Sequence, residues 1–235
     1  MAPAKTVEAE RTRLSRSAVV DRALQLADAE GIDALTIRRL ATELGVTPMA
    51  LYWHFRNKEE LIVALADRIW GEIKSDVDPA AAWPRQLRGL LESLIDVLRT
   101  HPSASALLIG NKMFGESSWQ VTEAALEVLH SAGFDALHAS EIARSALWTA
   151  LMLVMSEPGF DFLTQDERVE HLRRKQVELA SLPPQRYPRL VEAAVPMTTC
   201  DDDPVFHYQF GVDLFIAGVQ AMAPGGSPRD PHGGS

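Results

Sequence analysis

The stretch from Thr36 to Lys58, TIRRLATELGVTPMALYWHFRNK, constrains the fold more than any other part of this 235-residue chain. Its first residue is a favourable N-cap for a short helix, which Gly45 ends because glycine adopts the left-handed C′ conformation without steric cost. Thr47 caps a second helix, with Pro48 at a first position where no backbone N–H is needed. Two short helices joined by a tight turn predict a helix-turn-helix. In that motif the second helix, here residues 48–55, enters the DNA major groove.

A third helix is expected to complete an N-terminal DNA-binding domain, called the head below, that contains the helix-turn-helix. Ser15 or Ser17 begins it, a wide apolar stripe runs along it, and Gly31 ends it after about Glu30. Residues 1–14 lack periodic apolar side chains and are expected to form a flexible arm. The arginines in and beside this arm either reach DNA or belong to a solvated tail.

A variant of the capping box marks the helix that follows the motif. Asn57 is its N-cap and Glu60 its N3 residue, and apolar residues at helical spacing continue to about Lys74. The DNA-binding head is therefore predicted to span residues 15–75. Asp78-Pro79 lies in the boundary that separates it from the remaining chain.

The rest of the sequence predicts helices and no sheet, because no stretch shows sustained period-2 alternation. The expected helices cover about Pro84–Thr100, Ser103–Ile109, Ser118–Ala132, Ala136–Glu157, Asp166–Leu182, Tyr187–Ala194 and Pro204–Met222. They form a body at residues 76–222, and the Gly/Pro/Ser-rich tail at 223–235 is expected to be disordered. The predicted fold class is all-α, with a three-helix head and a larger helical body.

The net charge of −9 is distributed unevenly along the chain. Residues 1–58 hold nine Lys and Arg against seven Asp and Glu, whereas residues 76–235 hold twelve against twenty-one. A mildly basic head on an acidic body is the asymmetry expected of a DNA-contacting module carried by a separate domain.

Several other classes of protein are not supported. Cys200 is the only cysteine, which excludes an internal disulfide framework and a thiolate metal cluster. No long apolar run or signal peptide is present, so a cytoplasmic location is expected. No Gly-rich phosphate loop, His-Glu-x-x-His or Gly-x-Ser-x-Gly occurs, so an enzyme is not expected. Asp201–Asp203 and His207 are interpreted as an acidic loop before the last helix rather than a metal site.

The head resembles the TetR family of bacterial transcriptional regulators, and its tetracycline-repressor branch in particular. The matching residues are Ala23-Leu24, Gly31-Ile32, Leu35-Thr36, Arg38, Leu40-Ala41, Leu44-Gly45-Val46, Leu51-Tyr52-Trp53-His54, Asn57-Lys58 and Leu61, followed more weakly by Gly133-Phe134, Phe210-Gly211-Val212 and Ala217-Gly218-Val219. The resemblance implies an all-α homodimer with two reading heads and a ligand pocket in each body. Two helices of each subunit, near 136–157 and 204–222, would form a four-helix bundle at the dimer core.

Motif and resemblance together indicate which side chains meet DNA. Leu51 and Phe55 are expected to pack on the first helix of the motif, and Trp53 is interpreted as core or flank. The predicted DNA-binding residues are Thr36, Arg38, Thr47, Pro48, Met49, Tyr52, His54 and Lys58. Pro48-Met49-Ala50 departs from the polar base-reading residues of the tetracycline branch. Apolar groups here can touch thymine methyls but cannot form bidentate hydrogen bonds with a base.

For the pocket, the resemblance implies a second set of residues. The predicted ligand-binding residues are Leu90, Leu94, Leu108, Met113, Thr122, Leu126, Arg144, Trp148, Leu151 and Met152. For each of them, plain core packing is an equal alternative. The positions that hold a magnesium–tetracycline chelate in that branch are aligned with apolar residues here, so neither a bound metal, tetracycline nor another cofactor is predicted. An apolar pocket suits a hydrophobic small molecule, with Arg144 either facing its polar group or paired with an acid such as Glu141.

The predicted function is a ligand-responsive regulator that binds a palindromic operator as a dimer, represses, and is released by a hydrophobic small molecule. A dimeric DNA-binding regulator without a small-molecule effector is the alternative. Release is expected as a population shift, with the helix at 57–74 acting as the lever between head and body.

Overall fold

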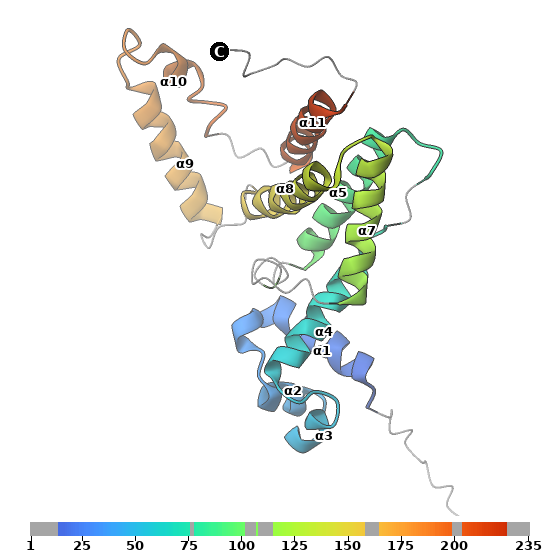
Figure 1. Cartoon of the computed structure of the whole chain (residues 1–235). Coiled ribbons are helices and arrows are strands. Elements are labelled where there is room, and N and C mark those ends of the chain that lie inside the picture. Colours follow the sequence, from blue (N-terminus) through green and yellow to red (C-terminus); the bar gives the residue numbers. More distant parts are fainter. Residues whose placement is uncertain are drawn as a thin grey trace, which may run out of the picture. The chain divides into compact units, whose positions relative to one another are not determined.

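The computed structural model describes residues 14–75, 78–101, 107, 115–157, 165–198 and 204–224. These residues form helices and no β-strand, which confirms the all-α prediction (Figure 1). The chain divides into two compact units. Unit 1 contains Met1–Ser75 and Thr100–Glu123, and unit 2 contains Asp76–Arg99 and Ala124–Ser235. Residues 100–123 therefore group with the N-terminal helices, although the sequence places them in the body.

Unit 1 begins with the helices of the predicted head. They are α1 (Arg16–Glu30), the short 3-10 helix η1 (Ile32–Ala34), α2 (Ile37–Glu43), α3 (Pro48–Tyr52) and α4 (Lys58–Trp70). Each α-helix starts where a polar side chain accepts a hydrogen bond from a backbone N–H three residues on. These N-caps are Ser15, Thr36, Thr47 and Asn57, with N–O distances of 3.1, 3.1, 3.3 and 2.8 Å.

The ends of these helices agree only in part with the positions predicted from the sequence. Gly31 and Gly45 have φ of 84° and 65°, as expected of residues that end a helix in the left-handed region. However, α3 ends at Tyr52 rather than Phe55, because the Leu51 carbonyl accepts from the N–H groups of both His54 and Phe55 at 2.9 and 3.0 Å. The turn that results brings Phe55 into the core.

The core of the head is built by α1, α2, α3 and α4 around fully buried aliphatic and aromatic side chains. They are Val19, Ala23, Leu40, Leu51, Phe55, Leu61 and Leu65. Each Leu or Phe that leaves water in this way contributes about 1.5–3 kcal/mol to folding. The burial of Leu51 and Phe55 confirms that they pack inward and hold α3 on the other helices.

The body helices match their predicted positions to within a few residues. They are α5 (Trp83–Thr100), α7 (Glu116–Ser131), α8 (Ala136–Met155), α9 (Gln165–Ala180), α10 (Pro188–Glu192) and α11 (Pro204–Met222). Within unit 2, α8 packs on α11 and α9 on α10. The helix predicted at Ser103–Ile109 and the tail at 223–235 lie largely outside the described residues.

Close approach between α8 and α11 depends on small and polar residues at their contact. Gly211 of α11 lies against Leu153 of α8 with no room for a Cβ atom. Next to it, His207 Nε2 is 2.9 Å from the Leu153 carbonyl, and Tyr208 donates its hydroxyl to Glu157 at 2.6 Å. Among the described helices, none has the length and apolar character needed to cross a membrane.

Candidate nucleic-acid interface

Helix α3 presents large side chains to solvent on the side opposite its buried Leu51. Met49 is 67% exposed, Tyr52 49% and Trp53 85%. Helix α3 and its C-cap residue thus expose three large side chains, whose apolar area the head does not cover. Such area marks a surface that meets another molecule.

The predicted DNA-binding residues lie on α3, in the turn that follows it and at the N-termini of α2 and α4. Six are exposed and the last two half-buried; in order they are Thr36, Arg38, Thr47, Pro48, Met49, Tyr52, His54 and Lys58. All of them belong to unit 1. The turn chemistry that caps α2, α3 and α4 therefore also places these side chains.

The two threonines have a structural function as well. Thr36 Oγ1 accepts from the Arg39 N–H and Thr47 Oγ1 from the Ala50 N–H. A hydroxyl that accepts in a cap still has its own O–H to donate. Both residues can therefore hydrogen-bond a phosphate or base edge without leaving the cap.

The neighbouring arginines of α2 differ in their surroundings. Arg39 pairs with Glu30 at 2.7 Å and Glu43 at 3.0 Å, and these acids hold the pKa of its guanidinium above the ordinary value. Arg38 is exposed and has no ion-pair partner in the described part of the chain. Of these two arginines, Arg38 is the one whose guanidinium has no ion pair among the described residues.

Of the two positions expected for Trp53, core or flank, the structure shows the flank. Trp53 is the C-cap residue of α3 and one of the most exposed large side chains of the described residues. Helical periodicity does not show this, because the chain turns out of the helix directly after Tyr52. The tryptophan belongs to the flank of the exposed α3 surface.

Helix α4 begins with a capping box that differs by one residue from the expected form. Asn57 Oδ1 accepts from the Glu60 N–H, while Glu60 Oε2 accepts from the Arg56 N–H at 2.8 Å. The other oxygen of Glu60 pairs with Arg16 of α1 at 3.3 Å. These contacts fix Lys58 at a helix N-terminus, where backbone N–H groups favour a phosphate.

The predicted ligand-binding residues are placed in different surroundings. Leu90, Leu94 and Leu151 are buried in unit 2, whereas Trp148 and Met152 are exposed on α8. Leu126 is half-buried in unit 2. Thr122 is half-buried in unit 1, and its hydroxyl donates to the Ser118 carbonyl at 2.7 Å. Arg144 is exposed and pairs with Glu141. Leu108 and Met113 lie outside the described residues.

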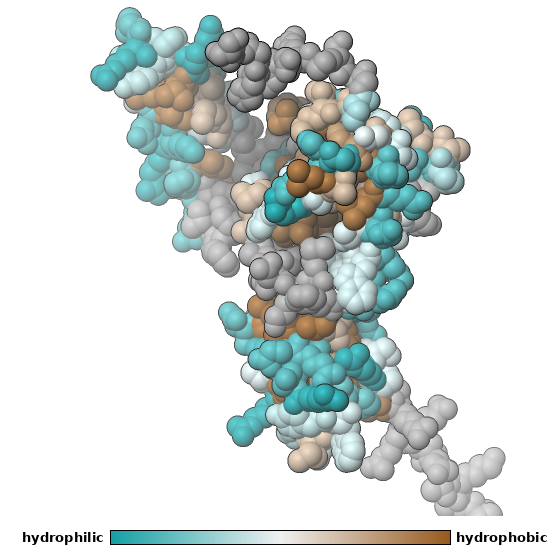
Figure 2. Space-filling view, viewed as in Figure 1, coloured by the Kyte–Doolittle hydropathy of each residue, from teal (hydrophilic) through white to brown (hydrophobic). Residues whose placement is uncertain are grey.

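Unit 2 also exposes an apolar surface on α8 and α11. Figure 2 shows apolar side chains at the surface of the region that contains these two helices. The exposed residues are Leu137, Trp148, Met152 and Met155 on α8, and Val205, Phe206, Phe210, Leu214 and Met222 on α11. A groove of about 290 Å³ runs between the helices, and Gly218 is part of its lining. His, Cys, Asp and Glu side chains form no metal-binding group of three in the residues that the structure describes.

Comparison with known proteins identifies both parts of the chain. Residues 19–65 match the family "Bacterial regulatory proteins, tetR family", and residues 77–223 match "Tetracyclin repressor-like, C-terminal domain". The tetracycline repressor protein class A from transposon 1721 of Escherichia coli is 33% identical over 152 residues, which cover 64% of this chain and 70% of that repressor.

Two solved structures extend the comparison. The Streptomyces coelicolor TetR family protein ActR, in complex with actinorhodin, has a TM-score of 0.80 and 26% identity, and the match covers 92% of this chain and 100% of ActR. BioQ with its double-stranded DNA operator has a TM-score of 0.60 and 26% identity, covering 89% of this chain and 99% of BioQ. With both domain models matched and the exposed α3 in place, the chain belongs to the TetR family and is a DNA-binding transcriptional regulator.

Proposed function

We propose that this chain is a dimeric repressor that binds a palindromic operator and leaves it when a hydrophobic small molecule binds. The observation that carries the proposal is the exposure of Met49, Tyr52 and Trp53 on α3. In a helix-turn-helix protein this is the surface that enters the major groove.

The side chains around α3 divide into two groups by chemistry. Arg38, Tyr52, His54 and Lys58 donate hydrogen bonds to phosphate oxygens, which position the head on the duplex. Pro48 and Met49 read bases through contact with thymine methyl groups, and the threonine hydroxyls supply the remaining hydrogen bonds. Specificity therefore depends on A·T pairs opposite the first turn of α3.

The exposed apolar surface of α8 and α11 supports the homodimer. A second copy related by a two-fold axis would cover the same surface on both subunits and form a four-helix bundle. The two recognition helices of such a dimer must lie about 34–36 Å apart to enter successive major grooves. This spacing requires a palindromic operator.

The small-molecule effector is supported by relatives and by composition. ActR is known in complex with actinorhodin. In this chain the candidates Leu90, Leu94 and Leu151 are apolar and buried, so a pocket that includes them suits a hydrophobic ligand. A ligand that prefers the state with displaced heads would lower operator affinity by the ratio of its affinities for the two states.

DNA binding is tested by selecting fragments from genomic DNA and titrating the enriched fragment at two salt concentrations. We expect a dimer complex whose affinity falls steeply with salt. Arg38→Ala should reduce the salt slope by about 1 for each head. Arg174→Ala removes the same charge from α9 and serves as the control, with an unchanged slope. Failure to enrich any fragment above random DNA contradicts the proposal.

The effector is tested with the same complex. Hydrophobic aromatic compounds, with actinorhodin among them, are screened for a rise in melting temperature and for release of the selected fragment. Tetracycline with Mg²⁺ serves as the negative control. Stabilisation together with release supports the proposed repressor. Fragment binding that no compound affects favours a regulator without a small-molecule effector.

A further inference from the structure

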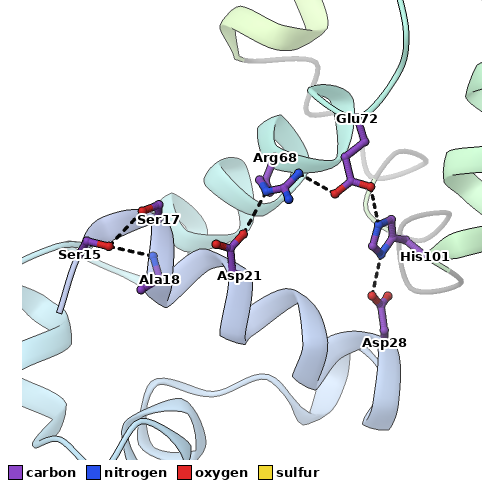
Figure 3. Close-up of polar contacts among 8 residues, drawn as sticks. All are labelled: Ser15, Ser17, Ala18, Asp21, Asp28, Arg68, Glu72 and His101. Carbon is purple, nitrogen blue, oxygen red and sulfur yellow. Dashed lines mark hydrogen bonds and ion pairs between the residues drawn. The ribbon is translucent and has the colours of Figure 1, made fainter. Parts of the chain in front are cut away.

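His101 follows the end of α5 and lies in unit 1 between two carboxylates (Figure 3). Its Nδ1 atom is 2.7 Å from Asp28 Oδ2 on α1, and its Nε2 atom is 2.9 Å from Glu72 Oε2 just after α4. The residue is only 9% exposed. Because an ionised carboxylate only accepts hydrogen bonds, both ring nitrogens must donate, and only the imidazolium form has two N–H groups.

Further charged groups continue this contact across the head. Arg68 of α4 donates to the second oxygen of Glu72 at 2.6 Å and to Asp21 of α1 at 3.0 Å. These contacts thus join His101 to Asp28 of α1 and to Glu72, and through Glu72 to Arg68 of α4 and Asp21 of α1. With a charged His101 the five groups sum to one negative charge, and loss of its proton leaves two.

We propose that His101, Asp28 and Glu72 form a proton-operated clamp that ties residue 101 to α1 and α4 and makes operator binding depend on pH. The inference rests on the proposed function, because operator binding is the property that the clamp regulates. When the proton leaves, one N–H remains for two carboxylates. The other nitrogen then turns a lone pair toward a carboxylate oxygen less than 3 Å away, and the clamp opens on that side.

Helix α4 holds the segment after His101 at a second point. Asp67 Oδ1 accepts from the Ser117 N–H at 2.9 Å, at the start of α7. Gly115 lies so close to the Asp67 carboxylate that a Cβ atom has no room. Residue 101 is therefore attached just after the C-terminal end of α4, and Ser117 is attached to α4 itself. Opening the clamp releases one of the two.

The consequence for DNA follows from preorganisation. Helix α1 packs on both α2 and α4, and α2 packs on α3. A closed clamp holds α1 and α4 in one arrangement before DNA arrives, so less ordering is required on binding. When the clamp is open, α1 and α4 must be ordered during binding, and the cost of this ordering makes the free energy of binding less favourable. Operator affinity is therefore expected to fall as pH rises.

The pH range follows from the titration of His101. Burial by itself lowers the pKa of His101, but the hydrogen bonds and charges of Asp28 and Glu72 outweigh it and raise the pKa above 6.5. A group whose pKa is raised by folding stabilises the folded state fully below its unfolded value, and this contribution is lost as pH rises through the folded value. The clamp is therefore fully closed below about pH 6.5, and it opens only as the pH rises through the higher pKa that His101 has in the folded protein.

The variant Glu72→Gln tests whether the contact between residue 72 and His101 can form without the proton on His101. A glutamine amide can donate to the bare Nε2 of neutral His101, while its oxygen still accepts from Arg68. This variant should keep the clamp closed without a proton. His101→Gln has no positive charge, and both of its N–H groups belong to one nitrogen instead of two, so it should leave the clamp open. His171→Gln on the exposed face of α9 is the matched control.

The experiment measures the imidazole titration of the full-length protein by NMR and its affinity for the selected DNA fragment from pH 6 to 8.5 at constant ionic strength. For the wild type and His171→Gln we expect His101 to titrate above 6.5. Their affinity should fall about tenfold over this range if DNA binding raises the pKa by about one unit. Glu72→Gln should keep its affinity at high pH, and His101→Gln should bind weakly throughout.

Two results would overturn the clamp. One is a His101 that titrates at or below 6.5 in the wild type. The other is an equal pH dependence in the wild type and Glu72→Gln. If Glu72→Gln does not fold, Asp28→Asn provides the same test at the other ring nitrogen. Absence of any selected fragment at every pH contradicts the proposed function instead, because the NMR titration of His101 does not depend on DNA.

Discussion

Replacing Gly211 with alanine is expected to overpack the contact between α11 and the Leu153 side chain of α8. A Cβ atom at residue 211 would lie 2.8 Å from Leu153 Cδ1 and 3.1 Å from its Cγ, and closer still to Cδ2. Overpacking of this kind typically costs about 1–3 kcal/mol. Inside a helix, alanine is also more favourable than glycine by about 1 kcal/mol, which offsets part of that cost.

Gly89→Ala isolates the two contributions. Gly89 is an exposed residue inside α5 of the same unit, and a Cβ atom there would meet nothing within 4 Å. This variant should gain the helix-propensity term alone, so the difference between the two variants is the overpacking cost. Each kcal/mol changes Tm by about 2–4 °C in a chain of this size.

The assay is thermal unfolding of the wild type and both variants, followed by circular dichroism at one protein concentration. We expect Gly89→Ala to melt slightly above the wild type, and Gly211→Ala to melt several degrees below Gly89→Ala. Equal Tm values for the two alanine variants would show that the Leu153 side chain moves aside without cost, and would refute the overpacking.

Three further predictions concern the base contacts, a partly buried hydrogen bond and the dimer. Replacing thymine by uracil in the selected fragment should weaken binding by up to about 0.8 kcal/mol per contacted methyl group. Met49→Ala should reduce this difference in a titration, because Pro48 remains to contact the methyl groups. Tyr208→Phe removes the hydroxyl that donates to Glu157 at 2.6 Å. It should lower the free energy of unfolding, measured in urea, by about 1–3 kcal/mol. An unchanged midpoint of urea unfolding would refute the contact. Gly218→Ala fills part of the groove between α8 and α11 and should weaken the dimer in sedimentation, whereas an unchanged association constant contradicts packing of the partner there.

The starts of the helices in the head could be predicted from the sequence because they depend on contacts within four residues. Thr36, Thr47 and Asn57 each bond a backbone N–H three residues on, and Gly31 ends α1 through its own φ. Such interactions join residues that are close together in the sequence, so the sequence is sufficient to predict them. The same local pattern located α3, and with it the surface expected to meet DNA.

Tertiary structure alone decided which side chains remain available on that surface and which partners the buried charges have. Arg38 and Arg39 are adjacent and chemically equal, yet only Arg39 meets acids supplied by α1 and α2. His101 is one unremarkable histidine in the sequence, and its partners lie 73 and 29 residues away. Local propensity carries no information about such contacts, because they arise only when packing of the apolar faces brings distant segments together.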